Sequence, residues 1–174
     1  IPGLRVVRSS VHGYGVVALR DFAEGELMAD IEGVTWREGE WWDDTYTLRI
    51  TDAVSFDMVD QTRWINHSCS ANAEIDLGLD EHGEPWAKLY AWRDIAAGEE
   101  VTYDYGFEFD VPYTPELLKA WACHCGSSNC RGTMLSPKQE ETPKKDKKEK
   151  SGKKDKKHKN CLLYTSPSPR DRTR

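Results

Sequence analysis

Residues 123–130 read Cys-His-Cys-Gly-Ser-Ser-Asn-Cys, and a fourth thiol lies far upstream, at the end of Ile-Asn-His-Ser-Cys, residues 65–69. Zinc binds four thiolates in a tetrahedron, so this division of three and one predicts a single zinc site that joins two distant segments. The middle side chain of an extended Cys-x-Cys points away from its neighbours, so His124 would face away from the metal. The predicted ligands are therefore Cys69, Cys123, Cys125 and Cys130.

Disulfides are the alternative use of these cysteines. The body of the chain, residues 1–137, is long enough and rich enough in aromatic residues to fold without cross-links. The neighbouring thiols of a Cys-x-Cys are also poorly placed to pair with each other. We therefore favour a metal site in a protein of a reducing compartment. Gly126 and Gly132 would allow the tight loop that such a site requires.

Two further segments have the residue types of a binding site. Residues 10–16 read Ser-Val-His-Gly-Tyr-Gly-Val, and the two glycines would let backbone amides come close to a carboxylate or phosphate. A turn or bulge is the more common meaning of such a pattern. In residues 99–107, Tyr103 and Tyr105 alternate with polar residues and would share one face of a strand. They could wall a narrow channel with two hydroxyls, or simply pack in a core.

The elements that must position these residues are mostly short strands. Runs rich in β-branched, apolar or aromatic residues predict strands over residues 4–7, 16–19, 27–31, 45–50, 73–77, 87–91 and 100–105. One helix is expected, with Thr114 as its cap, Pro115 in its first turn, and Leu117, Leu118 and Trp121 on one face. This helix would lead the chain into the cysteine segment.

Charge is divided unevenly along the chain. Residues 1–137 carry 10 Lys and Arg against 24 Asp and Glu, a net of −14, whereas residues 138–174 carry 14 against 6, a net of +8. An acidic body would repel nucleic acid and favours a basic partner, although solubility alone is an alternative reason. No apolar run approaches the roughly 20 residues of a membrane span, so no membrane partner is expected.

The composition changes after residue 135. Residues 143–159 are Lys, Asp and Glu with little else, too hydrophilic to offset the entropy of ordering, so they are predicted to be disordered. A solvated tail is the favoured interpretation, with weak nucleic-acid contact or a nuclear address as alternatives. Residues 161–174, which include Cys161, resemble translated cloning sequence and are excluded from the functional interpretation.

Taken in order, five segments resemble the SET-domain protein lysine methyltransferases: His-Gly-Tyr-Gly at 12–15, Tyr-Thr-Leu-Arg-Ile at 46–50, Asn-His-Ser-Cys at 66–69, Glu-Glu-Val-Thr-Tyr-Asp-Tyr-Gly at 99–106, and the cysteine segment. The resemblance is closest to members with a zinc-binding post-SET segment, such as the trithorax-like and Su(var)3-9-like groups. It implies a mostly β SET-domain (β-clip) fold of several small sheets with short helices and a C-terminal zinc knuckle. The implied domains are a SET domain over 4–110, a post-SET zinc segment over 111–135, a disordered Lys-rich tail over 136–160, and non-native or disordered residues over 161–174.

The same resemblance implies roles for individual residues. The cofactor S-adenosylmethionine would be bound by His12, Gly13, Tyr14, Gly15, Tyr46, Asn66, His67, Tyr105 and the backbone of His124. The active-site tyrosines would be Tyr105, near the reacting methyl, Tyr103, which limits how many methyls fit, and Tyr46. Zinc would be structural. Many members carry tyrosine where this chain has Ile31, and proline where it has Ala71.

The implied activity is S-adenosylmethionine-dependent N-methylation of a protein lysine. The favoured substrate is a histone tail, and the favoured location is nuclear or chromatin-bound. Because the Tyr103 hydroxyl takes up space and can hold a water, monomethylation is expected, with slow dimethylation. One alternative is a catalytically weak SET module that binds a peptide or partner protein. Another is methylation in cis of the tail, which contains 11 lysines.

Overall fold

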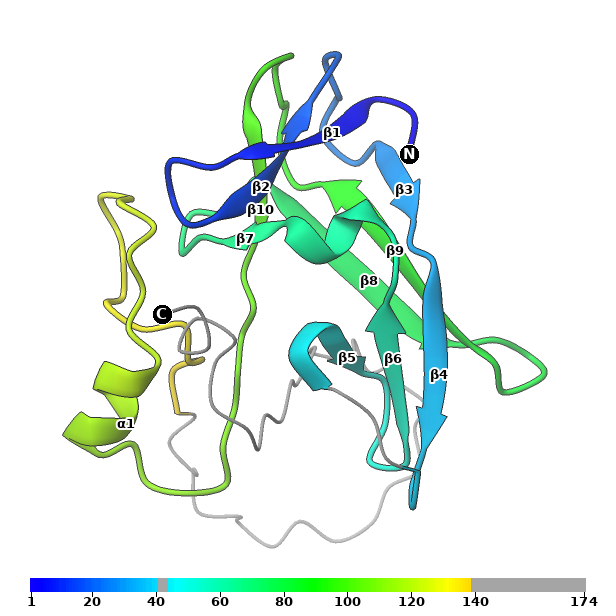
Figure 1. The fold of residues 1–174 in the computed structure, drawn as a ribbon, viewed down its shortest axis with the longest axis vertical. Helices are drawn as coiled ribbons and strands as arrows, with labels where there is room; N and C mark the ends of the chain where they lie inside the picture. The colour runs from blue at the N-terminus through cyan, green and yellow to red at the C-terminus, as the bar shows by residue number, and fades with distance from the viewer. Residues whose placement is uncertain (41–43, 139–174) are drawn as a thin grey trace, which may run out of the picture.

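In the computed structural model, which describes residues 1–40 and 44–138, ten strands form three small sheets (Figure 1). The first sheet has the order β1-β2-β10-β7, the second β3-β9-β8, and the third β4-β6-β5. The strands are β1 (Leu4–Arg8), β2 (Tyr14–Ala18), β3 (Leu27–Asp30), β4 (Gly33–Arg37), β5 (Thr47–Arg49), β6 (Val54–Met58), β7 (Asn66–His67), β8 (Ala73–Leu79), β9 (Pro85–Ala91) and β10 (Glu100–Tyr103). The helices are the 3₁₀ turns η1 (Asp44–Tyr46) and η2 (Gln61–Trp64) and the α-helix α1 (Pro115–Ala120).

A short parallel pairing positions the predicted site. β7 pairs with β10, with Thr102 opposite Asn66 and Tyr103 opposite His67. The amide of Ser68 extends this pairing by donating to the carbonyl of Tyr103, 3.2 Å away. The Asn-His-Ser-Cys segment and the two tyrosines therefore lie side by side, although more than 30 residues separate them in the sequence.

Two clusters of buried side chains hold the fold together. The larger lies between the sheets, where Val16, Leu89 and Val101 have no exposed surface. The smaller, beside α1, consists of Trp121, Cys123, Met134 and Leu135, with half-buried neighbours. In Figure 1, α1 and the segment after it lie to one side of the sheets. The cysteine-rich segment therefore packs as a separate small layer.

The predicted mostly β fold is confirmed, with differences at the ends of elements. Tyr46 lies in η1 rather than in a strand, and β10 ends at Tyr103, so Tyr105 lies beyond it. Strands β4 and β6 were not predicted. The predicted helix forms with Thr114 as its cap, although it ends at Ala120, and the buried Trp121 follows it.

The predictions for the tail concern residues 139–174, which lie outside the described residues and stay predictions. No helix within residues 1–40 and 44–138 is long and apolar enough to cross a membrane.

Candidate active site and metal centre

The structure brings the four predicted zinc ligands together. The ligand atoms of Cys69, Cys123, Cys125 and Cys130 all lie within 4.8 Å of one another. The sulfurs of Cys69 and Cys123 are 3.8 Å apart. A tetrahedron with zinc–sulfur bonds of about 2.3 Å has sulfur–sulfur edges of about 3.8 Å, whereas a disulfide needs about 2.0 Å. The cluster therefore fits a zinc ion, and the 3.8 Å between Cys69 and Cys123 is too long for a disulfide.

Local backbone geometry builds this cluster. Gly126 and Gly132 have φ of +72° and +73°, as the predicted tight loop requires. Three backbone amides donate to cysteine sulfurs, each at 3.4 Å. The amide of Cys125 donates to Cys123, that of Arg131 to Cys69, and that of Gly132 to Cys130. Amide donors stabilise thiolates, which are the form that binds metal.

The thiols of the cluster differ in acidity. Burial raises the pKa of Cys123 and of Cys69. Burial also acts to raise the pKa of Cys125, but the Ser127 hydroxyl and backbone amides outweigh it and lower this pKa to about 5. His124 is exposed and lies outside the group of ligands, as the alternation predicted.

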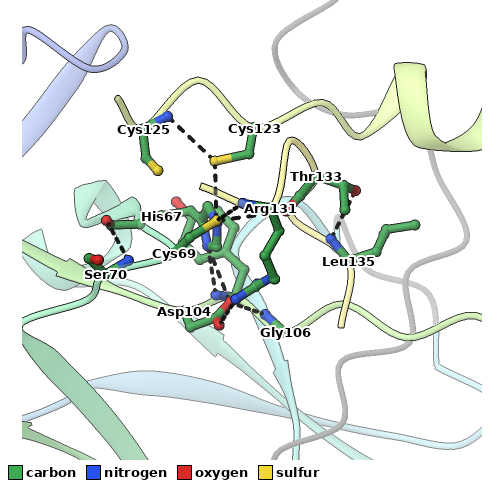
Figure 2. A network of polar contacts seen from close by, with 12 residues as sticks. His67, Cys69, Ser70, Asp104, Gly106, Cys123, Cys125, Arg131, Thr133 and Leu135 are labelled. Carbon is green, nitrogen blue, oxygen red and sulfur yellow. Dashed lines mark hydrogen bonds and ion pairs between the residues drawn. The ribbon is translucent and has the colours of Figure 1, made fainter. Parts of the chain in front are cut away.

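His67 links the cluster to the tyrosine segment (Figure 2). Its side chain is almost fully buried, at 2% exposure. Nδ1 accepts a hydrogen bond from the amide of Tyr105 at 3.1 Å, and Nε2 lies 3.4 Å from the sulfur of Cys69. A neutral imidazole that accepts at one nitrogen carries its proton on the other, so Nε2–H points at the ligand sulfur.

The two tyrosines of the predicted channel lie in contact. The rings of Tyr103 and Tyr105 have centroids 4.8 Å apart, even though Tyr105 lies beyond the strand. The Tyr105 hydroxyl donates to the carbonyl of Ile65 at 2.8 Å. Burial, and secondarily the neighbouring Tyr105, raises the pKa of Tyr103 well above its usual value. Tyr103 therefore keeps its proton at neutral pH and can donate a hydrogen bond.

A row of aromatic rings continues from these tyrosines into the C-terminal layer. Tyr105 lies 5.4 Å from Phe107 by ring centroids, and Phe107 lies 4.9 Å from Trp121, both edge to face. Such contacts each contribute about 0.5–1.5 kcal/mol beyond the area they bury. The cysteine-rich layer therefore packs directly against the tyrosine segment.

A cleft of about 470 Å³ opens beside the tyrosines. Its lining is largely apolar, with two carboxylates and the exposed indole of Trp92. The lining residues are Leu48, Cys69, Ser70, Ala71, Ala73, Glu74, Ile75, Leu77, Trp92, Tyr103, Asp104, Tyr105 and Asn129. Tyr46 does not line the cleft, and its ring packs on Trp64 at 5.5 Å and under the Arg63 guanidinium at 4.2 Å.

Asn66 ties the glycine loop to the first sheet. Its buried amide nitrogen donates to the carbonyls of His12 and Tyr14 at 3.2 and 2.8 Å, and to Glu100 at 2.9 Å. The Glu100 carboxylate also accepts from the Ser9 hydroxyl at 2.7 Å. This network holds the loop beside the start of β7.

The two glycines of the loop differ in what an added side chain would meet. A Cβ on Gly15 would lie 2.3 Å from the Glu100 carboxylate, so a side chain there would have to displace this carboxylate. Gly13 has φ of +51° and open space around it. The prediction that glycine lets a ligand approach the backbone therefore applies to Gly13.

Sequence reasoning did not single out Asp104 and Arg131, which form a bidentate ion pair of 2.7 and 2.8 Å. In the sequence, only their positions could have indicated these two residues. Asp104 lies between the two tyrosines, and Arg131 directly follows Cys130. Ile31, which occupies a position where many SET-domain proteins have tyrosine, is 6% exposed and belongs to the main core.

Comparison with known families matches residues 13–106 to the SET domain. This chain belongs to the SET-domain family. It is 32% identical over 139 residues to histone-lysine N-methyltransferase trithorax of Drosophila virilis, and 31% identical over 142 residues to histone-lysine N-methyltransferase 2B of Homo sapiens. Both matches cover 72% of this chain but only 3% and 5% of the relatives' own lengths.

A solved structure is also similar to this chain. The crystal structure of KRYPTONITE in complex with mCHH DNA, an H3(1–15) peptide and SAH matches with a TM-score of 0.61 and 28% identity. The match covers 76% of this chain and 29% of that one. The predicted SET fold is therefore confirmed, and the cysteine cluster at its C-terminal side could form a zinc site. The domain boundaries and the residue roles implied by the resemblance stay predictions.

Proposed function

We propose that this SET domain transfers a methyl group from S-adenosylmethionine to the side-chain amine of a protein lysine, with a histone tail as the favoured acceptor. The observation that carries the proposal is the contact of Tyr103 and Tyr105 at the cleft, next to a complete set of four zinc ligands. The names of the relatives and the H3 peptide and SAH in the KRYPTONITE structure support it.

The residues near Asn66 fit the cofactor. Gly13 leaves the loop backbone open, and Asn66 fixes the carbonyls on either side of it. When bound, S-adenosylmethionine supplies a methyl group on a positively charged sulfur. We assign its binding to the loop of His12, Gly13, Tyr14 and Gly15, to Asn66 and His67, to Tyr46 and Tyr105, and to the backbone of His124.

The tyrosines would favour the neutral form of the acceptor amine and would orient it. Lysine has a pKa of about 10.4, so only about one amine in a few thousand is neutral at pH 7. Burial between aromatic rings favours the neutral amine, which is the nucleophile. The Tyr105 hydroxyl donates to Ile65, so its oxygen can accept a hydrogen bond from the amine and turn the nitrogen lone pair toward the methyl. Such orientation can supply most of the rate without an acid or base.

The cleft suits an extended basic peptide. β5 is an edge strand of its sheet, and Leu48 in its centre lines the cleft. An extended segment can add to such an edge, and the carboxylate of Glu74 would attract basic side chains. We infer from this chemistry a histone tail as acceptor, and therefore action on chromatin.

Transfer of labelled methyl to mixed core histones tests the proposal. The zinc-loaded chain is incubated with radiolabelled S-adenosylmethionine, with Tyr105→Phe as the matched variant. Incorporation is expected to fall at least 100-fold in the variant, since it loses the oxygen that orients the amine. No incorporation by the unaltered chain at stoichiometric concentration would identify it instead as a module that binds without turnover. Incorporation lost in a chain ending at Ser136 would identify the lysine-rich tail as the acceptor.

A further inference from the structure

The Asp104–Arg131 ion pair joins the tyrosine segment to the cysteine segment (Figure 2). Asp104 directly precedes Tyr105, and Arg131 directly follows Cys130. We propose that this pair is a positioning device that fixes the post-SET segment against Tyr105 and thereby completes the active site. The proposal rests on the proposed function.

Each partner is tied to the backbone of its own segment. Oδ1 of Asp104 accepts from the amide of Gly106 at 3.1 Å, so the carboxylate spans the backbone of Tyr105. The amide of Arg131 donates to the sulfur of Cys69 at 3.4 Å. The ion pair therefore connects the turn that carries Tyr105 directly to a zinc ligand.

The charges near the pair explain why an arginine stands here. A zinc ion with four thiolates would have a net charge of −2, and the backbone amide of Arg131 contacts this cluster at the Cys69 sulfur. Oδ1 of Asp104 also lies 3.4 Å from Nδ1 of His67, which accepts a hydrogen bond from Tyr105. Without Arg131, the carboxylate would face this electron-rich nitrogen uncompensated. A bidentate guanidinium neutralises the carboxylate and fixes its direction.

The pair is partly shielded from water. The side chains of Arg131 and Asp104 are 26% and 41% exposed. Other contacts hold the segment independently: the amide of Phe107 donates to Met134 at 3.3 Å, and that of Ser136 donates to Phe107 at 2.8 Å. Loss of the pair should therefore loosen the alignment of the two segments without unfolding them.

Four variants test the pair in the zinc-loaded chain: Arg131→Gln, Asp104→Asn, the two combined, and Arg20→Gln as a matched control. Arg20 forms an ion pair of 2.7 Å with Glu26, far from the cysteine cluster in the sequence. We expect kcat/KM for S-adenosylmethionine to fall about 10- to 100-fold in both single variants, as is typical when a partner of a metal ligand is removed. The kcat/KM of the combined variant should be no lower than that of the less active single variant, because the two residues act as a unit.

Two further measurements separate positioning from folding or metal loss. Zinc content should stay at one per chain in every variant, and amide hydrogen exchange should quicken in residues 104–108 of Arg131→Gln but not of Arg20→Gln. Arg131→Lys keeps the charge but only one hydrogen bond, and should recover part of the activity.

Three results would overturn the proposal. These are activity and exchange of Arg131→Gln within twofold of the unaltered chain, single losses that multiply in the combined variant, and loss of zinc in parallel with activity. An unaltered chain that is inactive with zinc bound would instead count against the proposed function, and hydrogen exchange would still test the pair.

Discussion

The amide of Tyr105 donates a hydrogen bond to Nδ1 of His67, whose other ring nitrogen lies 3.4 Å from the sulfur of Cys69. One buried ring thus contacts both the backbone of the proposed catalytic tyrosine and a predicted zinc ligand. The resemblance to SET proteins implied that His67 belongs to the cofactor site. In the structure, its side chain also contacts Tyr105 and Cys69. Metal binding and the placement of Tyr105 are therefore expected to change together.

Replacing Tyr103 with Phe should raise the number of methyl groups transferred. The hydroxyl of this buried side chain takes up space beside Tyr105 and can hold a water. Its removal leaves room for a methylated amine to turn and react again. Mass spectrometry of a methylated histone peptide should show a shift from mono- toward di- and trimethyllysine. An unchanged distribution would show that Tyr103 does not limit the product.

Cys130→Ser should abolish stable zinc binding and most turnover, because three thiolates and a hydroxyl make a poor tetrahedral site. We expect metal content well below one per chain and a weaker affinity for S-adenosylhomocysteine by calorimetry. Cys161→Ser is the matched control, since Cys161 is outside the predicted ligand set. Full cofactor affinity in Cys130→Ser would contradict a zinc site that helps to form the active site.

Gly15→Ala should destabilise the glycine loop by about 1–3 kcal/mol. The new methyl would displace the Glu100 carboxylate from Ser9 and Asn66 and so break half-buried hydrogen bonds. Chemical denaturation measures the change in the free energy of unfolding. Gly25→Ala gives the opposite case, because its φ of +78° strains an alanine although an added Cβ would meet no atom within 4 Å. Unchanged stability in Gly15→Ala would refute the packing argument.

Trp92→Ala should weaken binding of the acceptor peptide. The indole is 61% exposed and lines the cleft. Loss of a large contact surface should raise KM for the peptide about 5- to 50-fold, equivalent to about 1–2.3 kcal/mol, with little effect on cofactor affinity. Leu19→Ala, a similarly exposed apolar residue outside the cleft lining, should leave both constants unchanged. An unaltered peptide KM in Trp92→Ala would remove the cleft as the acceptor site.

Arg93→Gln should reduce stability near neutral pH but not in acid. The hydrogen bond from Arg93 is the main reason why the pKa of Glu99 is lowered. A carboxyl with a lowered folded pKa contributes stability above its unfolded pKa of about 4.3, and this contribution is lost as pH falls through the folded value. Thermal melts of both chains should differ at pH 7 and converge as the pH falls below the lowered pKa of Glu99. A constant difference would show that Arg93 stabilises by packing.

Sequence patterns predicted what depends on local order. A few neighbouring residues are enough to define the cysteine spacing at 123–130, the start of the helix at Thr114–Pro115 and most of the strands. β7 has only two residues, too few for any periodic pattern, and its pairing to Thr102 and Tyr103 is a tertiary contact.

Contacts between residues far apart in the sequence could not be predicted from such local patterns. Asp104 and Arg131 lie 27 residues apart, and the sequence offers many equally charged partners for each. Tyr46 was expected in a strand, and its placement in η1 accompanies packing on Trp64 and Arg63. Such contacts depend on how the sheets meet, which no local pattern encodes.

The contact between Cys69 and Cys123 also has a consequence for chain entropy, because 54 residues separate them. A covalent cross-link that closes a loop of this length restricts the unfolded chain by about 4 kcal/mol, and a metal bound to both sulfurs should act similarly. That amount is a large share of the stability of an ordinary domain. Zinc availability would then set how much of this protein is folded as well as how much is active.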